Sequence, residues 1–423
     1  MLALVGCGGT SPPPAGPTTP PPTSPAELMD VHERIRVPGL DDRRFDHATY
    51  WAAVSPYLGG TVGSETVGRS AEGREIRHLT FGSGETTVLL WSQMHGDEST
   101  ASMALADIIR FFDQRSDHPL ARRIAEGSTV HMVPMLNPDG AERFQRRNAQ
   151  GIDVNRDARM LQTPEARTLK AVRDRIEPDF GFNLHDQSAA VRVGDSDRGV
   201  AVALLAPAFN EARDVDAKRQ RAMQVASLLK ESMDPMVAGH IAKYDDTFNP
   251  RAFGDLIGVW GASTVLIESG AWADDPQKQY LRRTNFVGIL SALDAIATGR
   301  YAEYDPAIYE ALEYNGRRVP DLLIAGGTVA VPGIPTLEAD IIVSYDLPLQ
   351  RREGVIDDMG DMGDAEAQDT LLVEDLYLIP MASALDERGG LAPGAPAHFI
   401  VAEDAQGRRE RFRFEGELPA GRR

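Results

Sequence analysis

Strand-like and helix-like segments alternate through the middle of the chain, and this order constrains the fold more than any other feature of the sequence. Short apolar runs bounded by turn residues indicate strands, whereas apolar residues at helical spacing indicate helices. The expected strands are 74–80, 86–91, 129–136, 179–184 and 263–267, and the expected helices are 46–57, 98–112, 164–176, 222–233 and 286–298. The first two strands flank a Gly-Ser turn, so we expect them to pair as a hairpin. The whole pattern predicts an α/β domain with a mixed central sheet flanked by helices.

The pattern changes beyond Tyr304, where short alternating stretches are separated by Gly and Pro turns. The stretches 321–329, 340–344 and 397–401 are typical of strands, so we expect a small β-rich C-terminal domain. A chain of 423 residues also exceeds the usual size of one domain. The expected division is a tether over residues 1–28, the α/β domain over 40–304 and the β-rich domain over 305–423. The sequence assigns no role to this last domain.

The chain has one cysteine, Cys7, which excludes an intramolecular disulfide and a thiolate metal cluster. Leu4-Val5-Gly6-Cys7 and the Pro/Thr/Ser-rich run up to about Pro25 are similar to a bacterial lipobox followed by a flexible tether. We therefore expect a lipid anchor at Cys7, with no other membrane contact, and a location in the cell envelope, lipid-anchored, periplasmic or secreted. Residues 1–6 lack a basic segment and a long apolar stretch, so the true start is expected upstream of Met1. The alternative is a disordered tail with an isolated cysteine.

The charge balance argues against nucleic acid as a partner. The chain has 44 basic and 63 acidic residues, a net charge of −19, and lacks the basic footprint that binding to a polyanion needs. No later stretch approaches the roughly 20 apolar residues of a membrane span.

A set of potential metal ligands lies where expected strands end. His95 and Glu98 follow the strand 86–91 and precede a helix, and His185 follows the strand 179–184. Ligands bind at the carboxyl edge of open α/β sheets, so these three side chains can converge there. Two histidines and one glutamate form a catalytic zinc set that leaves a coordination position open. We expect one Zn²⁺ per chain, held by His95, Glu98 and His185.

Six motifs occur in order between about Gly68 and Thr298. They are Gly68-Arg69-Ser70-Ala71-Glu72-Gly73-Arg74-Glu75-Ile76, the His95/Glu98 pair, Asn137-Pro138-Asp139-Gly140, Arg146-Arg147-Asn148 with Asp153-Val154-Asn155-Arg156-Asp157, then His185, and Leu266-Ile267-Glu268-Ser269-Gly270. Together they resemble the zinc carboxypeptidases of the carboxypeptidase A superfamily. The resemblance implies the mixed-sheet α/β fold of that family and hydrolysis of the C-terminal amide bond of peptides by a zinc-bound water.

The resemblance also implies roles for individual residues. Glu268 matches the family's general base, which then acts as general acid. Arg146 matches the stabiliser of the oxyanion, with Arg147 as the alternative if the register differs by one. Asn155 and Arg156 match the pair that binds the substrate's terminal carboxylate, so the expected partner is a peptide or peptide-like substrate with a free carboxylate.

Other residues near these motifs receive weaker assignments. We interpret Asp153 and Asp157 as structural residues that orient their loop. Asp186 either supports the neighbouring ligand or is an exposed loop carboxylate. Tyr244 lies in the region of the family's mobile tyrosine, but the register there does not establish the match.

Two alternatives remain. One is a zinc amidase that acts on muropeptides or N-acyl amino acids, because related deacylases share the metal ligands and an Asn-Arg pair. The other is a surface lipoprotein that binds peptides or glycans without hydrolysing them. The presence of all three ligands and Glu268 argues against the second alternative.

Overall fold

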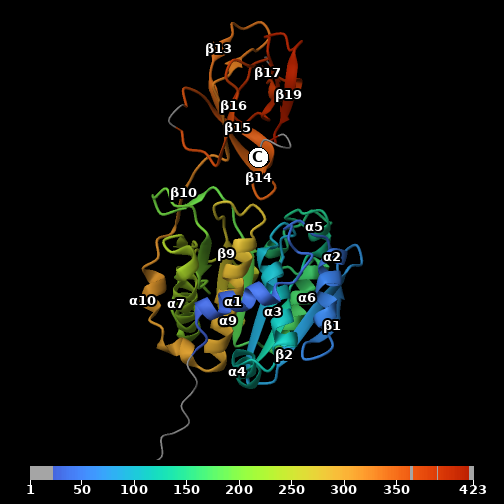
Figure 1. Cartoon of the computed structure of the whole chain (residues 1–423), viewed down its shortest axis with the longest axis vertical. Helices are drawn as coiled ribbons and strands as arrows, with labels where there is room; N and C mark the ends of the chain where they lie inside the picture. Colours follow the sequence, from blue (N-terminus) through green and yellow to red (C-terminus); the bar gives the residue numbers. More distant parts are fainter. Residues whose placement is uncertain (1–21, 363–364, 388, 419–423) are drawn as a thin grey trace, which may run out of the picture.

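The computed structural model describes residues 22–362, 365–387 and 389–418. Figure 1 shows a large α/β unit and, beyond one edge of it, a smaller unit built mostly of strands. Cys7 and the preceding residues lie outside the described ranges, so the structure does not test the expected lipid anchor. Within those ranges, no helix combines the length and apolar character that crossing a membrane requires.

The α/β unit is built around an eight-stranded mixed sheet with the strand order β1-β2-β4-β3-β5-β9-β7-β8. Its strands are β1 (Gly63–Arg69), β2 (Glu75–Gly82), β3 (Thr86–Ser92), β4 (Ser128–Val133), β5 (Phe180–Asp186), β7 (Val202–Leu205), β8 (Ile241–Lys243) and β9 (Ser263–Ser269). Its helices are α1 (Pro25–Ile35), α2 (His47–Val54), α3 (Thr100–Gln114), α4 (Pro119–Gly127), α5 (Pro138–Glu142), α6 (Pro164–Ile176), α7 (Ala217–Val237), α8 (Phe253–Val259), α9 (Gln279–Ala297) and α10 (Pro306–Glu310). The expected mixed sheet with flanking helices is confirmed.

One sequence-based prediction about this sheet is wrong. The strands expected to form a hairpin, now β2 and β3, are separated by β4, which pairs antiparallel with β2 and parallel with β3. Gly84 in the turn between them lies against the start of β4, where an added Cβ would be only 2.2 Å from the backbone of Gly127. The strand that forms a hairpin with β2 is instead β1, across the turn at residues 70–73.

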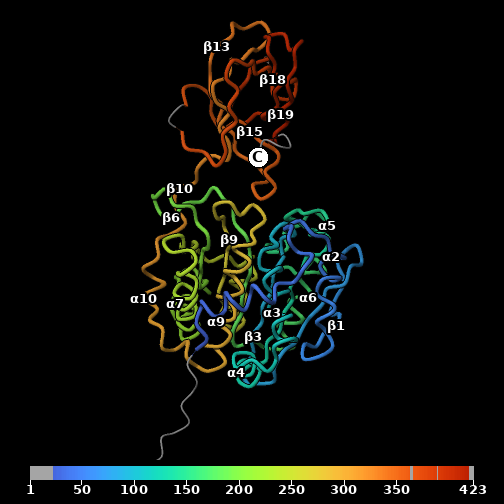
Figure 2. The backbone as a smooth tube through the Cα atoms, viewed as in Figure 1, coloured from blue at the N-terminus to red at the C-terminus, as the bar shows by residue number. Residues whose placement is uncertain are grey.

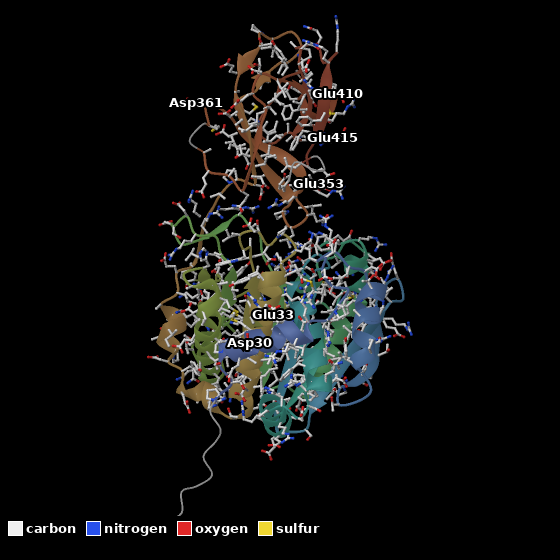
Figure 3. All side chains as sticks on the ribbon, viewed as in Figure 1. Asp30, Glu33, Glu353, Asp361, Glu410 and Glu415 are labelled. Atoms are coloured by element: carbon white, nitrogen blue, oxygen red, sulfur yellow. The ribbon has the colours of Figure 1, made fainter. Side chains whose placement is uncertain are left out.

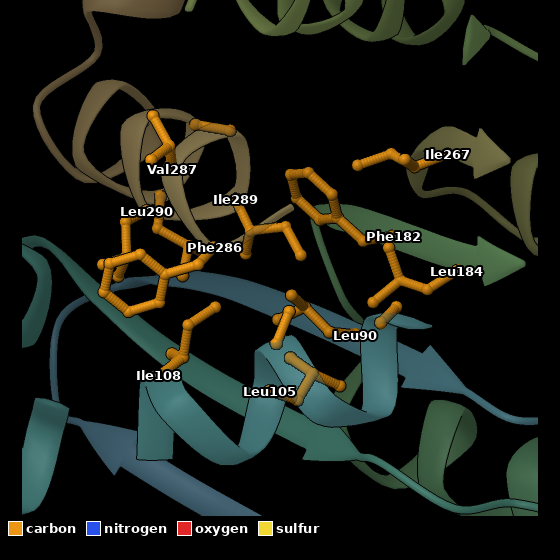
Figure 4. Close-up of a cluster of buried hydrophobic side chains, with 14 of the residues drawn as sticks. Leu90, Leu105, Ile108, Phe182, Leu184, Ile267, Phe286, Val287, Ile289 and Leu290 are labelled. Carbon is orange, nitrogen blue, oxygen red and sulfur yellow. The ribbon is translucent and has the colours of Figure 1, made fainter. Parts of the chain in front are cut away.

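Apolar side chains cover both faces of the sheet. On one face α3, α7 and α9 pack against the strands, and on the other face α6 and α8 do so. Figure 4 shows the first of these cores, where side chains of β3, β5 and β9 meet those of α3 and α9. The labelled members are Leu90, Leu105, Ile108, Phe182, Leu184, Ile267, Phe286, Val287, Ile289 and Leu290. Each fully buried side chain of this kind stabilises the fold by about 1.5–3 kcal/mol.

The α/β unit extends beyond the range expected for it. Helix α1 begins with a capping box, in which Ser24 and Glu27 bond to each other's backbone N–H, and its Leu28 is fully buried in the main core. Tyr309 of α10 is buried in the same core. The unit therefore includes α1, which overlaps the expected tether 1–28, and α10, which was expected in the β-rich part.

A buried charge network ties α1 to the unit. Asp107 of α3 accepts hydrogen bonds from Arg282 Nε at 2.7 Å and Nη2 at 2.6 Å, and its Oδ2 lies 2.9 Å from His32 Nε2 of α1. Arg282 also donates to the backbone oxygens of Val37 and Leu40. Burial alone would raise the pKa of Asp107, but the contacts with His32 and Arg282 outweigh it and lower the pKa.

The smaller unit consists of two sheets that share one apolar core, with the strand orders β15-β14-β11-β16 and β13-β12-β17-β18-β19. Its strands are β11 (Leu322–Ala325), β12 (Thr328–Val329), β13 (Leu337–Glu338), β14 (Asp340–Leu347), β15 (Arg352–Gly360), β16 (Asp369–Leu372), β17 (Tyr377–Pro380), β18 (His398–Ala402) and β19 (Glu410–Glu415). The expected β-rich C-terminal part is confirmed. Acidic side chains lie on the outside of both units, among them Asp30 and Glu33 of α1 and Glu410 and Glu415 of β19 (Figure 3).

Among the described residues, the contacts that join the units include a pair of short strands and a turn. Strand β10 (Asn315–Arg318) pairs antiparallel with β6 (Val191–Val193) of the α/β unit, and the two lie side by side in Figure 2. The turn between β14 and β15, residues 348–351, also reaches the α/β unit. There Arg43 Nη2 donates to Leu349 O at 3.1 Å and Arg44 Nη2 to Gln350 O at 3.4 Å.

The Asp107 network leads to a stability prediction. Replacing Asp107 by Asn leaves Arg282 buried with its charge uncompensated, so the free energy of unfolding is expected to fall by about 3–5 kcal/mol at pH 7 in urea titrations. Because folding lowers the pKa of Asp107, the stabilisation is complete above the unfolded pKa of about 4 and is lost as the pH falls toward the folded value.

The difference between wild type and Asp107→Asn is therefore expected to narrow below about pH 4. Asp117→Asn, an exposed change in the same region, is the matched control and should leave stability unchanged. A difference that stays constant from pH 7 to pH 3 would contradict a charged Asp107 in the folded protein.

Candidate active site

The carboxyl ends of three adjacent parallel strands place the expected site residues at one edge of the sheet. β5 pairs in parallel with β3 on one side and with β9 on the other. His95 and Glu98 lie in the loop after β3, and His185 lies near the end of β5. Glu268 of β9 is the direct register partner of His185, so both side chains leave the sheet on the same face.

The three expected metal ligands meet around the carboxylate of Glu98. His95 Nδ1 lies 2.8 Å from Oε1, and His185 Nδ1 lies 2.6 Å from Oε2. Their potential ligand atoms are all within 4.8 Å of one another, and the three residues are at most 3% exposed. Burial alone would raise the pKa of Glu98, but His95 and His185 outweigh it and hold the pKa well below its usual range.

The donor set fits a zinc ion. Both imidazoles present Nδ1 to the carboxylate of Glu98, and the other ring nitrogen of His95, Nε2, lies 3.0 Å from Asp153 Oδ1. A carboxylate on the remote nitrogen fixes the ring and its tautomer, which is the usual arrangement for a ligating histidine. Two nitrogens and one carboxylate oxygen leave a coordination position for water or substrate.

Backbone contacts explain why the loop that carries His95 and Glu98 also contains Gln93 and Gly96. Gln93 has a positive φ of 50°, and its side chain donates to the backbone oxygen of Gly96. An added Cβ at Gly96 would lie 1.9 Å from the backbone of Gly140, so only glycine fits. Asn137 donates through Nδ2 to Met94 O and accepts at Oδ1 from the N–H of Gly140. The Asn137–Gly140 motif therefore contacts and holds the backbone of the loop that carries His95 and Glu98.

Asp139 of that motif holds the first motif in place. It accepts hydrogen bonds from Ser70 Oγ at 2.6 Å, from Glu72 N at 3.0 Å and from Arg74 Nη1 at 2.8 Å. The turn between β1 and β2 is thus fastened to the loops that carry the site, although no residue of the turn lines the cleft.

Of the two arginines that the sequence left open for the oxyanion, the structure brings Arg146 to the ligands. Its Nη1 lies 3.2 Å from His95 Nδ1 and 3.3 Å from Glu98 Oε1, and Nε and Nη2 both bond to Asp153 Oδ2. Arg147 is exposed and donates to Gly151 O. Asp153 thus orients both a ligand and the cation, which is more specific than the loop-ordering role that we expected.

Glu268 is 8% exposed and lies among other carboxylates. Burial, with the charges of Glu98 and Asp186, raises the pKa of Glu268 well above its usual range. Asp186 is only 3% exposed, so the interpretation of it as an exposed loop carboxylate is wrong. It accepts from Thr100 Oγ1 at 2.7 Å and pairs with Lys278 at 3.2 Å, while its backbone N–H donates to Glu98 Oε2.

Asn155 and Arg156 lie together at the wall of the same cleft. Asn155 Oδ1 accepts from Phe253 N at 2.9 Å, which fixes the start of α8. Arg156 Nη1 donates to Asn155 O, and in the described part of the chain no ion pair joins this guanidinium to a carboxylate. A partly buried guanidinium of this kind can bind a carboxylate with two parallel hydrogen bonds.

The cleft has a volume of about 810 Å³ and contains all seven expected site residues. Tyr244 also lines it, and the charge of Glu268, together with burial, raises the pKa of that tyrosine. Asp255, whose pKa burial raises to about 6, lies in the same wall. The sequence analysis did not identify Asp255.

Residues beyond 304 line the cleft as well, and the sequence analysis missed them. Asn315, Arg318, Pro348 and Leu349 belong to β10 and to the β14–β15 turn. No local motif marks these residues, because their place in the cleft depends on how the smaller unit docks.

Comparisons with known proteins point to the same family. Residues 50–189 match the zinc carboxypeptidase family, which confirms the resemblance inferred from the motifs. Probable carboxypeptidase 2 of Arthroderma benhamiae is 25% identical over 136 residues, covering 30% of this chain and 26% of that protein. Carboxypeptidase SOL1 of Arabidopsis thaliana is 38% identical over 65 residues, covering 15% and 13%. The chain thus spans well under half the length of the curated relatives that it matches.

Solved structures are similar at lower identity. A metallo-carboxypeptidase from Pseudomonas aeruginosa is 20% identical, with 62% of this chain and 71% of that chain covered and a TM-score of 0.48. A metallo-carboxypeptidase from Burkholderia cenocepacia is 21% identical, with 61% and 68% covered and a TM-score of 0.44.

The ligand geometry predicts a metal content. Wild-type protein dialysed against zinc is expected to retain one zinc per chain by atomic emission, and His185→Ala is expected to retain far less, because one of three ligands is lost. His131→Ala is the matched control, since His131 pairs with His78 in the same sheet, away from the cluster. Equal zinc in wild type and His185→Ala would rule out this ligand set.

Proposed function

We propose that this chain is a zinc-dependent metallocarboxypeptidase that hydrolyses the C-terminal amide bond of peptides. The observation that carries the proposal is the convergence, in one cleft, of a His-Glu-His ligand cluster, a buried glutamate and an arginine without a carboxylate partner in the described residues. The match of residues 50–189 to the zinc carboxypeptidase family supports the same class of reaction. Each group has a distinct chemical task.

Glu268 is the group suited to move protons. Bound zinc supplies Lewis-acid stabilisation of negative charge and makes water a nucleophile at neutral pH. Glu268 takes a proton from the attacking water and delivers it to the leaving amine, and its buried position beside other carboxylates increases its proton affinity. Its alignment with His185 across the β5–β9 ladder keeps it beside the cluster.

Arg146 is the group suited to stabilise the oxyanion. Two hydrogen bonds to Asp153 hold its guanidinium before substrate arrives, so little reorganisation is needed as negative charge develops on the scissile carbonyl. The same aspartate holds His95, so the cation and the metal ligand are positioned relative to each other.

Arg156 and Asn155 make the proposed enzyme an exopeptidase. The terminal carboxylate of a peptide would bind the guanidinium fork of Arg156, and the amide of Asn155 lies beside it in the cleft wall. Once the terminus is held there, only the last amide bond can reach the metal cluster. A peptide without a free carboxylate lacks this anchor.

Hydrolysis assays on the Glu268→Gln variant test the proposal. Its kcat on a free-carboxylate peptide is expected to fall by roughly 10²–10⁴-fold while zinc content is unchanged, because only the proton-transfer group is lost. Glu126→Gln, an exposed change on α4, is the control and should keep full activity.

The same assay compares free and C-terminally amidated peptides. Wild type is expected to cleave only the free form, and Arg156→Gln to raise KM for that form. Zinc binding without cleavage of any peptide would favour the amidase alternative, and muropeptides and N-acyl amino acids would then be the next substrates. Full activity in Glu268→Gln would overturn the proposed mechanism.

We also propose that Cys7 carries a lipid that places the enzyme in the cell envelope. The lipobox-like residues 4–7 and the Pro-rich run after them support this proposal. The chain expressed in a bacterium behind a complete signal sequence is expected to partition into detergent phase, and Cys7→Ser to partition into the aqueous phase. Aqueous partitioning of both would contradict an anchor at Cys7.

A further inference from the structure

A second cavity of about 390 Å³ adjoins the active-site cleft. The two cavities share Gln187, Pro348 and Leu349, which form the border between them. Asn155 and Arg156 are expected to hold the C-terminal residue of a substrate. Neither residue lines the second cavity. Its walls come from residues 43–44, from the segment before α9 and from the β14–β15 turn.

The position of the border determines which part of a peptide can enter this cavity. A substrate anchored by its carboxylate at Arg156, with its last amide bond at the metal cluster, must direct its remaining residues away from Arg156. Gln187 follows the ligand His185 by two residues and lies on the border. The second cavity is therefore within reach of residues N-terminal to the scissile bond.

Two of the cations that line the cavity have no ion-pair partner among the described residues. Four basic residues and two acidic ones line it: Arg43, Arg44, Lys278 and Arg351, against Asp274 and Asp275. Lys278 is paired with Asp186, and Arg351 with Asp369. Asp275 accepts three backbone N–H groups at the start of α9. Arg43 and Arg44 have no ion-pair partner among the described residues, so their guanidinium groups are the ones on this wall that can pair with an incoming carboxylate, although Asp274 and Asp275 balance their charge over the wall as a whole.

Arg43 is held in place by contacts other than ion pairs. It donates to Leu349 O, and its guanidinium carbon lies 5.1 Å from the centre of the Phe144 ring. Its Nε is buried and has no hydrogen-bond partner in the described part of the chain. Burial lowers the pKa of Arg43, while the charges of Asp186 and Asp97, which form no ion-pair contact with it, act in the opposite direction.

Gln187 offers a second donor. Its Oε1 accepts from Asn315 Nδ2 at 2.7 Å, which turns Nε2 toward Gly270, a residue that lines only the second cavity. Gln187 is 8% exposed, and its Nε2 has no partner among the described residues. Buried donors of this kind are costly unless an acceptor occupies the site.

From these contacts we infer that the second cavity is a subsite for a side-chain carboxylate located N-terminal to the scissile bond, so that the enzyme selects peptides that are acidic there. The inference rests on the proposed function and adds a substrate class to it. Gln187 Nε2 and the guanidinium of Arg43 bind the carboxylate, and the β14–β15 turn forms the wall beside them.

Matched peptides test the inference on the zinc-loaded full chain. Glu or Gln is placed at the first, second or third residue before the scissile bond, with the same C-terminal residue throughout. Wild type is expected to prefer Glu over Gln in kcat/KM by about tenfold at one of these positions, the size of one charge-assisted hydrogen bond. Gln187→Glu, which keeps the side-chain size, should reverse the preference, and Arg43→Gln should reduce it. Arg122→Gln, an exposed change on α4, should leave it intact.

A binding measurement separates this inference from the proposed activity. Calorimetric titration of the same peptides into zinc-loaded Glu268→Gln protein should show the same preference for Glu, and adding Gln187→Glu should reverse it. Tighter binding of Glu peptides without hydrolysis by wild type would support the subsite and overturn the carboxypeptidase. Equal kcat/KM and equal binding for Glu and Gln peptides would overturn the subsite, whatever the activity. Thermal unfolding of each variant checks that it is folded.

Discussion

The parallel ladder that joins β3, β5 and β9 is the constraint on which the site depends. Because neighbouring strands run in the same direction, their carboxyl ends meet at one edge, and the register sets His185 beside Glu268. A slip of one residue between β5 and β9 would turn one of these two side chains to the opposite face of the sheet. The apolar residues that alternate with them are buried in the cores on both faces, so the packing that stabilises the sheet also fixes the register of the site.

Polar contacts between the loops then fix the positions of the side chains that the sheet brings to this edge. Four charged or potentially charged groups, His95, Glu98, Arg146 and Asp153, form a closed set in which each member contacts at least two others. Buried groups of this kind are costly unless they are paired, so the set is stable only as a whole. The Asn137–Gly140 motif carries no expected ligand. Its role is structural, because it supplies backbone contacts to the loop that carries His95 and Glu98.

The sequence predicted what depends on local pattern and missed what depends on distant packing. The helix 164–176 was predicted correctly because Thr163 caps it and Pro164 begins it, signals that act within one turn. The capping box at Ser24 was an equally local signal, but the Pro-rich run before it masked helix α1. The hairpin between β2 and β3 failed because a short turn does not reveal that β4, over forty residues later, inserts between them. The expected metal ligands could be predicted from motifs, and so could Glu268 and Arg146. No sequence motif predicts that Pro348 and Leu349 line the cleft.

Pro348 and Leu349 form one wall of the cleft, and they are synthesised after the expected ligands, Glu268 and Arg146. A ribosome completes the sheet and the expected ligands well before it releases residue 348, so the proposed metal site can form while the cleft still lacks one side. Cutting a mature chain between the two units would likewise leave the expected ligands and Glu268 on one fragment and this wall of the cleft on the other. The β14–β15 turn and the expected ligands thus lie in separate stretches of the chain, so the sequence of the turn can change without a change in any ligand.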